Sequence, residues 1–436
     1  MKILLLTQYY APEVGAPQER LGYLVKFLAN RGHQMTVVTC SPNYPHGNLY
    51  EGHKNNFFKS SHDIVDDSIS IHRTWVYLTK GKKDFAHRLL NYLSFAISSL
   101  KVIGSVGKID LVFVETPPIF LSFTATIYSW IKWAPKVVHF ADPWVTFATE
   151  NGYLKKNSLL TKLAFFLEKK SLCMSKLVVV PNPGILDSCI TTHNLKPLST
   201  KLIMNGVDTE FFYPDDMMKS SISKKYNFMD KFIVIYSGTH QIQANLDVLV
   251  KAAKKLKSTG ENEICFVLVG AGADKQRIRD LALSEGVLDE NFKMLDPVPV
   301  TQIREFLQAS DVGANPLAAS PATHKTLSVK MLSYMGIGLP LIITDRKVQS
   351  KIVQQAKCGL CCPAEDEDAW VKNILYLKNN KEKAKIMGDN GRVYASEHLS
   401  RKKLAYSMEC ELMKVAKLNP PPPLENVMQV TCKSNG

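Results

Sequence analysis

The sequence lacks a hydrophobic run long enough to cross a lipid bilayer. Its longest apolar stretch, residues 119–131, has about 13 residues and contains Ser and Thr, whereas a membrane-spanning helix needs roughly 20. The N-terminal segment MKILLLTQYYAP has one Lys and a short apolar run followed by Tyr and Pro, which favours a buried strand over a signal peptide. We therefore expect a cytoplasmic protein.

A regular cysteine framework is also absent. The nine cysteines are scattered along 436 residues, which is typical of a protein in a reducing cytosol. Cys358, Cys361 and Cys362 form one cluster, CGLCC, with CxxC spacing. A zinc site would need two further ligands, and the sequence offers no second CxxC and no paired His motif. A buried strand edge is therefore favoured over a metal or redox site.

Nucleic-acid-binding motifs are missing although the chain is basic. The formal net charge is +14, and the excess of Lys and Arg is spread over both halves of the chain. Nucleic acid, a membrane surface or an anionic substrate would each account for this charge. Because the sequence has no zinc finger, RNA-binding motif or aromatic-interleaved basic groove, nucleic acid is the weakest of the three.

Short apolar runs alternate with helical patterns over most of the chain. Runs such as KILLLT, MTVVTC, FIVIYSG and ICFVLVG are typical of buried parallel strands, and the segments between them have apolar residues at three- and four-residue spacing. Turn residues interrupt the alternation at NGVDTEFFYP, residues 205–214. We predict an α/β protein with two doubly wound Rossmann-like domains that face a central cleft.

The predicted domains are residues 1–205 and residues 206–400. A last helical pattern, residues 403–417, is expected to pack back on the N-terminal domain. The Pro-rich tail that follows, residues 418–436, is expected to be disordered. Residues 41–67 are polar and turn-rich, which predicts a long loop.

Residues 153–176 combine six lysines with a broad apolar face and one acid, Glu168. Two interpretations stay open. The commoner one is a core-packed helix with a solvated lysine face. The other is a basic amphipathic surface beside a membrane.

The stretch SDVGANPLAASPATHKTLSVKMLSYMGIGLPLIIT, residues 310–344, predicts a strand, a loop, a compact helix over residues 327–335 and a second strand. In a parallel α/β unit such a loop and helix N-terminus lie at the carboxyl end of the sheet. Free N–H groups and the helix dipole favour an anion there. A phosphorylated ligand and an ordinary crossover without a ligand both fit this stretch alone.

Several segments in a fixed order carry a resemblance to a known family. They are YYAPEVGAPQERLGYLVKFLANRGHQMTVVTCSPNYPHG, NGVDTEFFYP, YSG, FVLVGAG, VPVTQIREFLQASDVGANPL and KMLSYMGIGLP. Together they resemble family-4 retaining glycosyltransferases with the GT-B fold, in particular the bacterial branch that builds capsule and lipopolysaccharide O-antigen units. The similarity spans residues 1–410. Each motif is weak alone, and the set is specific.

The resemblance implies a hexosyltransferase of cell-surface polysaccharide biosynthesis that uses a nucleotide sugar, with no metal and no further cofactor. It implies that glycine loops and Lys330 hold the donor diphosphate, because glycine lets the backbone approach a phosphate closely. The expected donor-binding residues are Gly15, Gly238, Thr239, Gly270, Gly272, Lys330, Ser333 and Tyr334, and the expected catalytic residue is Asp142, which would contact acceptor or donor-sugar hydroxyls.

The implied acceptor is a polyprenyl-linked saccharide. This acceptor is anionic and would be met at the inner face of the cytoplasmic membrane, so a peripheral location and an anionic membrane surface are further expectations. No nucleic-acid partner is expected.

The sequence departs from the family pattern near the expected site. Lys325 and Ser333 stand where the family has an acidic pair eight residues apart, and Ala141 replaces a basic residue that often precedes the acid at Asp142. Losing a charged partner in one hydrogen bond costs about 1.5–3 kcal/mol, which weakens donor binding without abolishing it. The alternative function is therefore a catalytically silent relative that acts as a partner or scaffold protein. A nucleotide-sugar epimerase ranks last, because it would need acid and base groups around the sugar and the sequence does not indicate where such groups would be.

Overall fold

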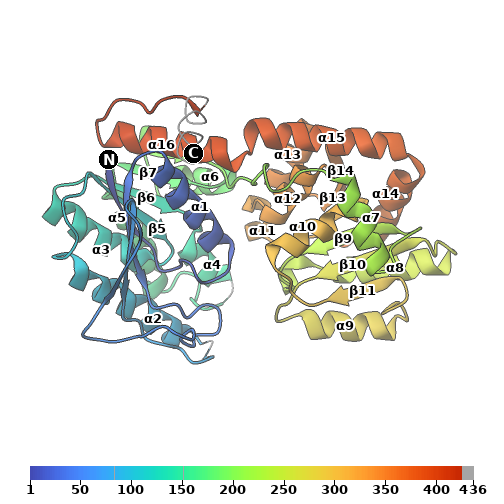
Figure 1. Cartoon of the computed structure of the whole chain (residues 1–436). Helices are drawn as coiled ribbons and strands as arrows, with labels where there is room; N and C mark the ends of the chain where they lie inside the picture. Colours follow the sequence, from blue (N-terminus) through green and yellow to red (C-terminus); the bar gives the residue numbers. More distant parts are fainter. Residues whose placement is uncertain (83, 151, 425–436) are drawn as a thin grey trace. The chain divides into compact units, whose positions relative to one another are not determined.

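The computed structural model describes residues 1–82, 84–150 and 152–424. The chain divides into two compact units (Figure 1), of which the first contains Met1–Met204 and the chain from Lys402 onward, and the second contains Asn205–Arg401. These limits lie beside the predicted boundaries at 205 and 400. The last helix, α16 (Arg401–Val415), packs on the first unit through Ala405, Met408 and Leu412.

The first unit contains an eight-stranded sheet in the order β3-β4-β2-β1-β5-β6-β7-β8. Neighbouring strands are parallel except β3 and β4, which form an antiparallel pair at one edge. The strands are β1 (Lys2–Leu6), β2 (Gln34–Cys40), β3 (Ser61–Asp66), β4 (Ile69–Thr74), β5 (Leu111–Thr116), β6 (Lys136–Phe140), β7 (Leu177–Val180) and β8 (Thr200–Leu202). The predicted loop over residues 41–67 thus contains strand β3.

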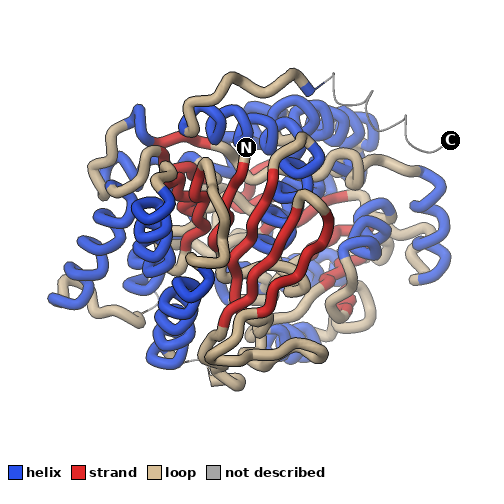
Figure 2. The backbone as a smooth tube through the Cα atoms, turned by 60° about the vertical axis from the view of Figure 1, so that its left-hand side comes forward, coloured by secondary structure: helices blue, strands red, loops and turns tan. Residues whose placement is uncertain are grey.

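Helices cover both faces of this sheet, because successive strand residues point to opposite sides. In β1, Ile3 and Leu5 pack with helices α1 and α16, whereas Leu4 and Leu6 pack with α2, α3, α5 and α6. The helices are α1 (Ala16–Asn30), α2 (Phe85–Ser98), α3 (Ile119–Lys132), α4 (Trp144–Glu150), α5 (Leu159–Cys173) and α6 (Pro183–Thr191), with short 3₁₀ turns η1 (Ser99–Val102) and η2 (Pro197–Ser199). Figure 2 shows strands flanked by these helical layers.

The second unit contains a six-stranded, fully parallel sheet in the order β11-β10-β9-β12-β13-β14. Its strands are β9 (Phe232–Ser237), β10 (Ile264–Val269), β11 (Phe292–Leu295), β12 (Val312–Asn315), β13 (Leu341–Thr344) and β14 (Gly359–Cys362). Its helices are α7 (Asp216–Lys225), α8 (Asp247–Ser258), α9 (Lys275–Ser284), α10 (Val300–Gln308), α11 (Pro321–Lys325), α12 (Val329–Ile337), α13 (Lys347–Ala356), α14 (Glu367–Asn379) and α15 (Lys381–His398), with the 3₁₀ turn η3 (Ile242–Ala244). The predicted fold class, two Rossmann-like α/β domains, is confirmed.

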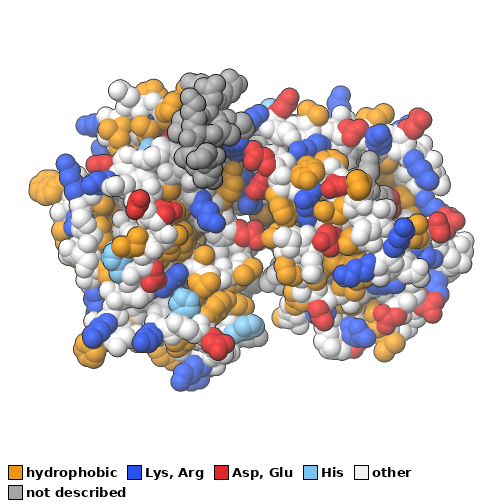
Figure 3. All heavy atoms as spheres, in the orientation of Figure 1, with side chains coloured by type: hydrophobic (Ala, Val, Ile, Leu, Met, Phe, Trp, Pro, Cys, Tyr) orange, Lys and Arg blue, Asp and Glu red, His pale blue; other side chains and the backbone are white. Residues whose placement is uncertain are grey.

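The CGLCC segment forms the edge strand β14, with Cys358 and Cys362 buried, so the predicted strand edge is confirmed. Within the described ranges, no group of three or more His, Cys, Asp or Glu side chains is placed to hold a metal ion. None of the helices in those ranges has both the length and the apolarity that crossing a bilayer requires. Positive and negative side chains are interspersed over the visible face of each unit (Figure 3).

Part of the predicted disordered tail is packed on the first unit. Tyr406 Oη donates a hydrogen bond to the carbonyl oxygen of Pro421 (3.4 Å), and the guanidinium of Arg31 donates one to that of Pro422. Pro421 is buried. These contacts order the segment before residue 425, whereas residues 425–436 of the predicted tail lie outside the described residues.

The strand order of each sheet changes direction once, and these two points indicate where ligands bind. In the first unit the chain proceeds from β1 to β2 and then returns to the other side of β1 as β5; in the second it proceeds from β9 to β10 and returns as β12. In open parallel sheets, ligands bind beyond the carboxyl ends of the strands at such a switch point. Ligands are therefore expected at the loops after β1, β5, β9 and β12.

Candidate active site

Two glycine loops meet at the switch point of the second unit. Gly238 follows β9 with φ 151°, and Gly270 follows β10 with φ 149°. A Cβ atom at Gly270 would lie 2.0 Å from the carbonyl oxygen of Gly238, and one at Gly272 would lie 2.0 Å from that of His240. Two hydrogen bonds join the loops, from Gly238 N to Val269 O (3.0 Å) and from His240 N to Ala271 O (2.9 Å). The two loops, here called the glycine cradle, thus approach each other more closely than a side chain at Gly270 or Gly272 would allow.

Lys330 lies against this cradle from the N-terminal turn of α12. Its Cε would lie 2.7 Å from a Cβ at Gly238, and its Nζ is 4.7 Å from the centre of the Tyr236 ring. Burial lowers the pKa of Lys330 to about 8. In the described part of the chain no carboxylate forms an ion pair with it, so the cradle carries a desolvated positive charge suited to an anionic ligand.

Tyr334, one helical turn after Lys330, supports the cradle from beneath. It is fully buried, and its hydroxyl accepts a hydrogen bond from Ser237 N (2.9 Å). A Cβ at Gly313 would lie 2.5 Å from its ring, so the glycine makes room for it. This buried tyrosine therefore positions the end of β9, and its expected part in donor binding stays a prediction.

The other expected donor residues of the second unit lie close to the cradle. The carbonyl oxygen of Thr239 accepts a hydrogen bond from Tyr236 Oη (2.7 Å), which fixes the turn after Gly238. Ser333 is half-buried on α12, between Lys330 and Tyr334 in sequence. Lys325, which replaces the first acid of the family pattern, is exposed at the end of α11.

His240 is a buried residue of the cradle that the sequence did not single out. Its side chain is fully buried, and neither ring nitrogen has a hydrogen-bond partner among the described residues. Burial, and then the positive charges of Lys275 and Lys330, lower its pKa to about 4, so the imidazole is neutral at pH 7. Its Nε2 would lie 3.3 Å from a Cβ at Gly270, which places the ring directly under the second loop.

Asp142 and Gly15 belong to the first unit. Gly15 is the N-cap residue of α1 with an extended backbone, φ 167°. A Cβ there would meet only the flexible end of the Gln18 side chain, at 2.5 Å, so the local structure does not demand glycine. The preceding loop is held by Glu13, whose carboxylate accepts hydrogen bonds from the backbone N–H groups of Asn43 (2.7 Å) and Tyr44 (2.9 Å).

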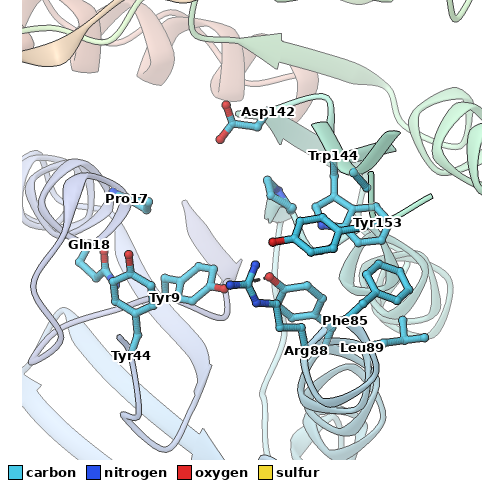
Figure 4. A pocket seen from close by; sticks show the side chains of 13 residues that line it. Tyr9, Pro17, Gln18, Tyr44, Phe85, Arg88, Leu89, Asp142, Trp144 and Tyr153 are labelled. Atoms are coloured by element: carbon cyan, nitrogen blue, oxygen red, sulfur yellow. Dashed lines mark hydrogen bonds between the residues drawn. The ribbon is translucent and has the colours of Figure 1, made fainter. Parts of the chain in front are cut away.

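A cavity of about 400 Å³ opens at the switch point of the first unit. It lies beyond the ends of β1, β5 and β6, since Tyr9, Pro117 and Asp142 line it, and its walls are largely aromatic (Figure 4). The aromatic lining residues are Tyr9, Tyr44, Phe85, Tyr92, Trp144 and Tyr153. Arg88 of α2 adds a guanidinium, which lies over the Tyr153 ring at 5.8 Å from its centre. Such a cavity suits a sugar ring stacked on an aromatic face beside an anionic group.

Asp142 lies at the opposite end of this cavity from Leu89 (Figure 4). Its side chain is solvent-accessible, yet crowding by the surrounding protein raises its pKa to about 6. The positive charge of Arg20 lowers that pKa and the negative charge of Glu115 raises it. A carboxyl group with a pKa of about 6 is mostly ionised at pH 7, and its oxygen atoms can then accept a hydrogen bond from a sugar hydroxyl.

A buried network lies behind Asp142. Glu115 accepts a hydrogen bond from His139 Nδ1 (2.7 Å) and forms an ion pair with Arg20. Burial alone would raise the pKa of Glu115, but the charge of Arg20 and the contact with His139 outweigh it and hold that pKa below its usual value. The network fixes α1 against the ends of β5 and β6, where Asp142 begins the next loop.

A second cavity of about 540 Å³ adjoins the first. The two share Tyr9, Tyr44, Arg88 and Tyr92 as lining residues. The second is more polar, because Asn43, His46 and Asn48 contribute to it from the loop after β2. Together they give the first unit an extended site in which Arg88 is central.

Two family models match the chain, one in each unit. The model described as Glycosyltransferase Family 4 matches residues 19–211, and the model described as Glycosyl transferases group 1 matches residues 218–394. The second match includes Gly238, Gly270, Gly272 and Lys330, and the first includes Asp142.

Curated relatives are distant. The chain is 24% identical to a putative colanic acid biosynthesis glycosyl transferase of Escherichia coli, over 67% of this chain and 71% of the relative. It is 25% identical to an Escherichia coli UDP-Gal:alpha-D-GlcNAc-diphosphoundecaprenol alpha-1,3-galactosyltransferase, over 59% of this chain and 64% of the relative.

Solved structures share the fold at low sequence identity. An Anabaena HepE protein, solved with UDP and glucose, has a TM-score of 0.68 at 16% identity and covers 95% of this chain and 100% of its own. Sucrose-phosphate synthase of Thermosynechococcus elongatus has a TM-score of 0.72 at 15% identity, covering 94% of this chain and 97% of its own. The two matching domain models and the two Rossmann-like units agree, and the chain is a glycosyltransferase of the family-4 type with the GT-B fold.

Proposed function

We propose that the protein transfers a hexosyl group from a nucleotide sugar to a lipid-linked saccharide in cell-surface polysaccharide biosynthesis. The observation that carries the proposal is the glycine cradle with the unbalanced charge of Lys330 beside it. The leaving group of such a transfer is a nucleoside diphosphate, on which negative charge grows in the transition state. Backbone N–H groups and a fixed cation stabilise that charge.

The proposal includes no metal ion and no further cofactor. Lys330 supplies positive charge at the place where a metal would otherwise neutralise the diphosphate. Retention of the anomeric configuration, by front-face displacement, is part of the proposal on the strength of the family resemblance.

The aromatic cavity of the first unit is the proposed acceptor site. Its tyrosines and Trp144 offer faces for stacking a sugar ring, and Arg88 offers a fork of donors for a phosphate oxygen. A polyprenyl-linked saccharide presents both groups, a sugar and a diphosphate. The relative that acts on a diphosphoundecaprenol-linked sugar supports this choice of acceptor. We place the enzyme in the cytoplasm, at the inner face of the cytoplasmic membrane.

A panel of nucleotide sugars tests the proposal. Calorimetry identifies which donor binds, and transfer is then measured with a membrane extract as the source of acceptor, with and without a chelator. The expected result is micromolar binding of one donor and transfer that the chelator does not change. If no donor bound, the proposed function would be wrong. If the chelator abolished transfer, the proposal that no metal ion is needed would be wrong.

One observation favours a second candidate, a catalytically silent partner or scaffold protein. Ser333 and Lys325 occupy the positions of the acidic pair that holds donor hydroxyls in the family. The same panel separates the two candidates, because a silent relative binds a donor without turnover even when the acceptor source is active with another transferase.

The pH dependence of transfer tests the role of Asp142. Because its pKa is about 6, the carboxylate is ionised at pH 7 and becomes protonated as the pH falls below that value. Transfer by the parent chain is therefore expected to decline below pH 6. An Asp142→Asn variant is expected to be roughly ten- to a hundredfold slower in kcat/KM, the effect of losing a charge-assisted hydrogen bond.

The decline below pH 6 should be absent from the Asp142→Asn profile. Glu19→Gln is a suitable control, because Glu19 lies on α1 in the same unit and does not line the cavity. A profile of Asp142→Asn that keeps the parent's decline would show that another group titrates.

A further inference from the structure

The loop after β12 lies beside the glycine cradle. This β12–α12 loop, residues 316–328, contains the short helix α11 and ends at Ser328, the N-cap residue of α12, two residues before Lys330. Near the start of the loop, Ala318 N donates a hydrogen bond to the carbonyl oxygen of Gln243 (3.0 Å). Gln243 belongs to η3, which follows the first cradle loop. A ligand on the cradle therefore has the β12–α12 loop as a neighbour.

A buried arginine holds this loop. Arg346, the N-cap residue of α13, is 4% exposed. Its Nη2 donates a hydrogen bond to the carbonyl oxygen of Leu317 (2.8 Å), and its Nε donates one to that of Ala318 (3.1 Å). Its Nη1 donates a third to the carbonyl oxygen of Asp345 (2.6 Å). The planar fork of the guanidinium thus fixes two successive peptide groups of the loop.

The partners of the Arg346 guanidinium are neutral oxygens. Burial lowers the pKa of Arg346, and the negative charges of Asp345 and Glu365 only partly oppose this shift. Taking a charged group out of water is costly, and bonds to carbonyl oxygens offset only part of that cost. A costly contact of this kind is expected where the shape of a loop serves a function.

Arg346 sets the direction of one backbone N–H group. The carbonyl oxygen of Ala318 accepts a second hydrogen bond, from Thr323 Oγ1 (2.7 Å), so both of its lone pairs are used. In a trans peptide the N–H group points opposite to the carbonyl. The N–H group of Ala319 therefore points away from Arg346, and Ala319 is exposed. The contact with Arg346 thus presents a fixed hydrogen-bond donor on the exposed side of the loop.

The two ends of the loop are joined by Asn315, which is fully buried at the end of β12. Its Oδ1 accepts a hydrogen bond from Ser328 Oγ (3.3 Å), and its Nδ2 donates one to Gln349 Oε1. Gln349 lies on α13, the helix that Arg346 caps, and α11 also packs against α13 (Figure 1). One helix therefore holds both the ends and the middle of the loop.

The composition of the loop suits a sugar better than a base. Residues 316–328 contain no Phe, Tyr or Trp on which a base could stack, and four of them are Ser or Thr. A nucleotide sugar has its nucleoside on one side of the diphosphate and its sugar on the other. Sugar hydroxyl oxygens accept hydrogen bonds from fixed N–H donors. The sugar is therefore the part of a cradle-bound donor that matches this loop.

We propose that Arg346 is a positioning residue for the donor sugar. By holding Leu317 and Ala318, it keeps the N–H group of Ala319 where a hydroxyl oxygen of the hexosyl group accepts its hydrogen bond. Arg346 itself touches no substrate. This inference rests on the proposed function, because it requires the diphosphate of a nucleotide sugar on the cradle, and it adds the residue that fixes the contact to the transferred group.

An Arg346→Lys variant tests the proposal, because it keeps the charge and loses the planar fork. Calorimetry compares three probes: the nucleotide sugar that the donor panel selects, its nucleoside diphosphate, and deoxy analogues that each lack one sugar hydroxyl. One deoxy analogue is expected to bind the parent chain about tenfold more weakly than the full donor. In Arg346→Lys this difference is expected to disappear, while the affinity for the nucleoside diphosphate stays within about twofold of the parental value.

Arg392→Lys is the matched control. Arg392 lies on α15 of the same unit, and its guanidinium also donates hydrogen bonds to backbone carbonyl oxygens, those of Thr209, Phe212 and Gly336. Thermal unfolding is expected to show a similar loss of stability in this variant and in Arg346→Lys. Arg392→Lys is nevertheless expected to keep the tenfold difference between the full donor and the deoxy analogue, which a merely structural role of Arg346 would also leave in place.

A Thr323→Val variant provides a second test that does not depend on the folding of Arg346→Lys. It removes the other hydrogen bond to the carbonyl oxygen of Ala318 and is expected to reduce the tenfold difference as well. A full difference in both variants, or a parent chain that binds every deoxy analogue like the full donor, would overturn the proposal. Equal losses of affinity for the donor and the nucleoside diphosphate would also overturn it. Failure of the proposed function is distinct, because the parent chain itself would then bind no nucleotide sugar.

Discussion

A Lys330→Met variant is expected to bind a nucleoside diphosphate about ten- to a hundredfold more weakly than the parent chain. A hydrogen bond from an ammonium to a phosphate oxygen contributes about 1.5–3 kcal/mol, and each 1.4 kcal/mol is about a tenfold change in Kd. Met keeps an unbranched apolar stem against Gly238 and Tyr236, so the cradle keeps its packing. Titration calorimetry with UDP, GDP and ADP measures the change.

The same substitution is expected to raise the free energy of unfolding near pH 7. The pKa of Lys330 is about 8 in the folded unit against 10.5 for a free lysine, so folding penalises the charged form. This free-energy penalty for burying the charged Lys330 is fully present below pH 8, the pKa of Lys330 in the folded chain. It shrinks as the pH rises from 8 to 10.5, where the unfolded chain holds more protons, and it is absent above both values. Denaturant titrations across this range should show the variant's advantage disappearing at high pH.

Lys351→Met provides the matched control, because Lys351 is an exposed lysine on α13 of the same unit. Its diphosphate affinity and its stability are expected to equal those of the parent. A Lys330→Met variant with parental affinity would remove Lys330 from the donor site. Parental affinity together with lowered stability would give the lysine a structural role.

The cradle could be located from sequence, but the reason for its glycines could not. YSG and FVLVGAG end apolar runs, which predicts glycines at the carboxyl ends of parallel strands. That Gly270 must lack a Cβ follows from the carbonyl oxygen of Gly238, which belongs to another loop. The distance between two loops depends on strand pairing, and single-sequence patterns do not contain it.

The burial of Tyr334 shows how the depth of a side chain on a short helix escapes prediction. Lys330 and Tyr334 are four residues apart, so both lie on the same side of α12. The sequence could not show that Tyr334 would reach under β9, because the space for its ring is created by Gly313 on a neighbouring strand. The two side chains therefore share a direction but differ in depth, because Tyr334 is fully buried whereas Lys330 is half-buried against Gly238.

The aromatic cavity of the first unit could not be predicted from the sequence, because its residues come from separate elements. Tyr9 follows β1, Tyr44 follows β2, Tyr92 belongs to α2, and Tyr153 lies between α4 and α5. No spacing links them. The available signal was the aromatic, turn-rich loop after β2, which contains Tyr44.

The network behind Asp142 was partly within reach of the sequence. Glu115 and His139 are in register on adjacent parallel strands, so aligning the two apolar runs would have paired them. The strand β3 was not within reach. It lies in a polar, turn-rich stretch, and its pairing with β4 overrides the weak local preference of residues 61–66.

A Gly270→Ala variant is expected to lose donor binding and to destabilise the second unit by roughly 2–4 kcal/mol. Two costs combine in this substitution. At φ 149° an L-residue is strained, and the new Cβ would lie 2.0 Å from the carbonyl oxygen of Gly238, which is backbone and cannot rotate away. The loops would have to separate, which disrupts the proposed binding surface for the diphosphate. Thermal unfolding and calorimetry with the cognate donor measure the two effects.

A Gly260→Ala variant separates the cost of the steric contact at Gly270 from the cost of backbone strain, because Gly260 also has a positive φ but has no close neighbour. Gly260 ends α8 in the same unit with φ 84°, and a Cβ there would meet nothing within 4 Å. This control is therefore expected to lose about 1 kcal/mol and to bind donor as the parent does. The difference between the two variants isolates the cost of pushing the loops apart. If Gly270→Ala were no less stable than Gly260→Ala and still bound the donor, the close backbone contact would not be what shapes the site, and the affinity for phosphate would have to come from Lys330 alone.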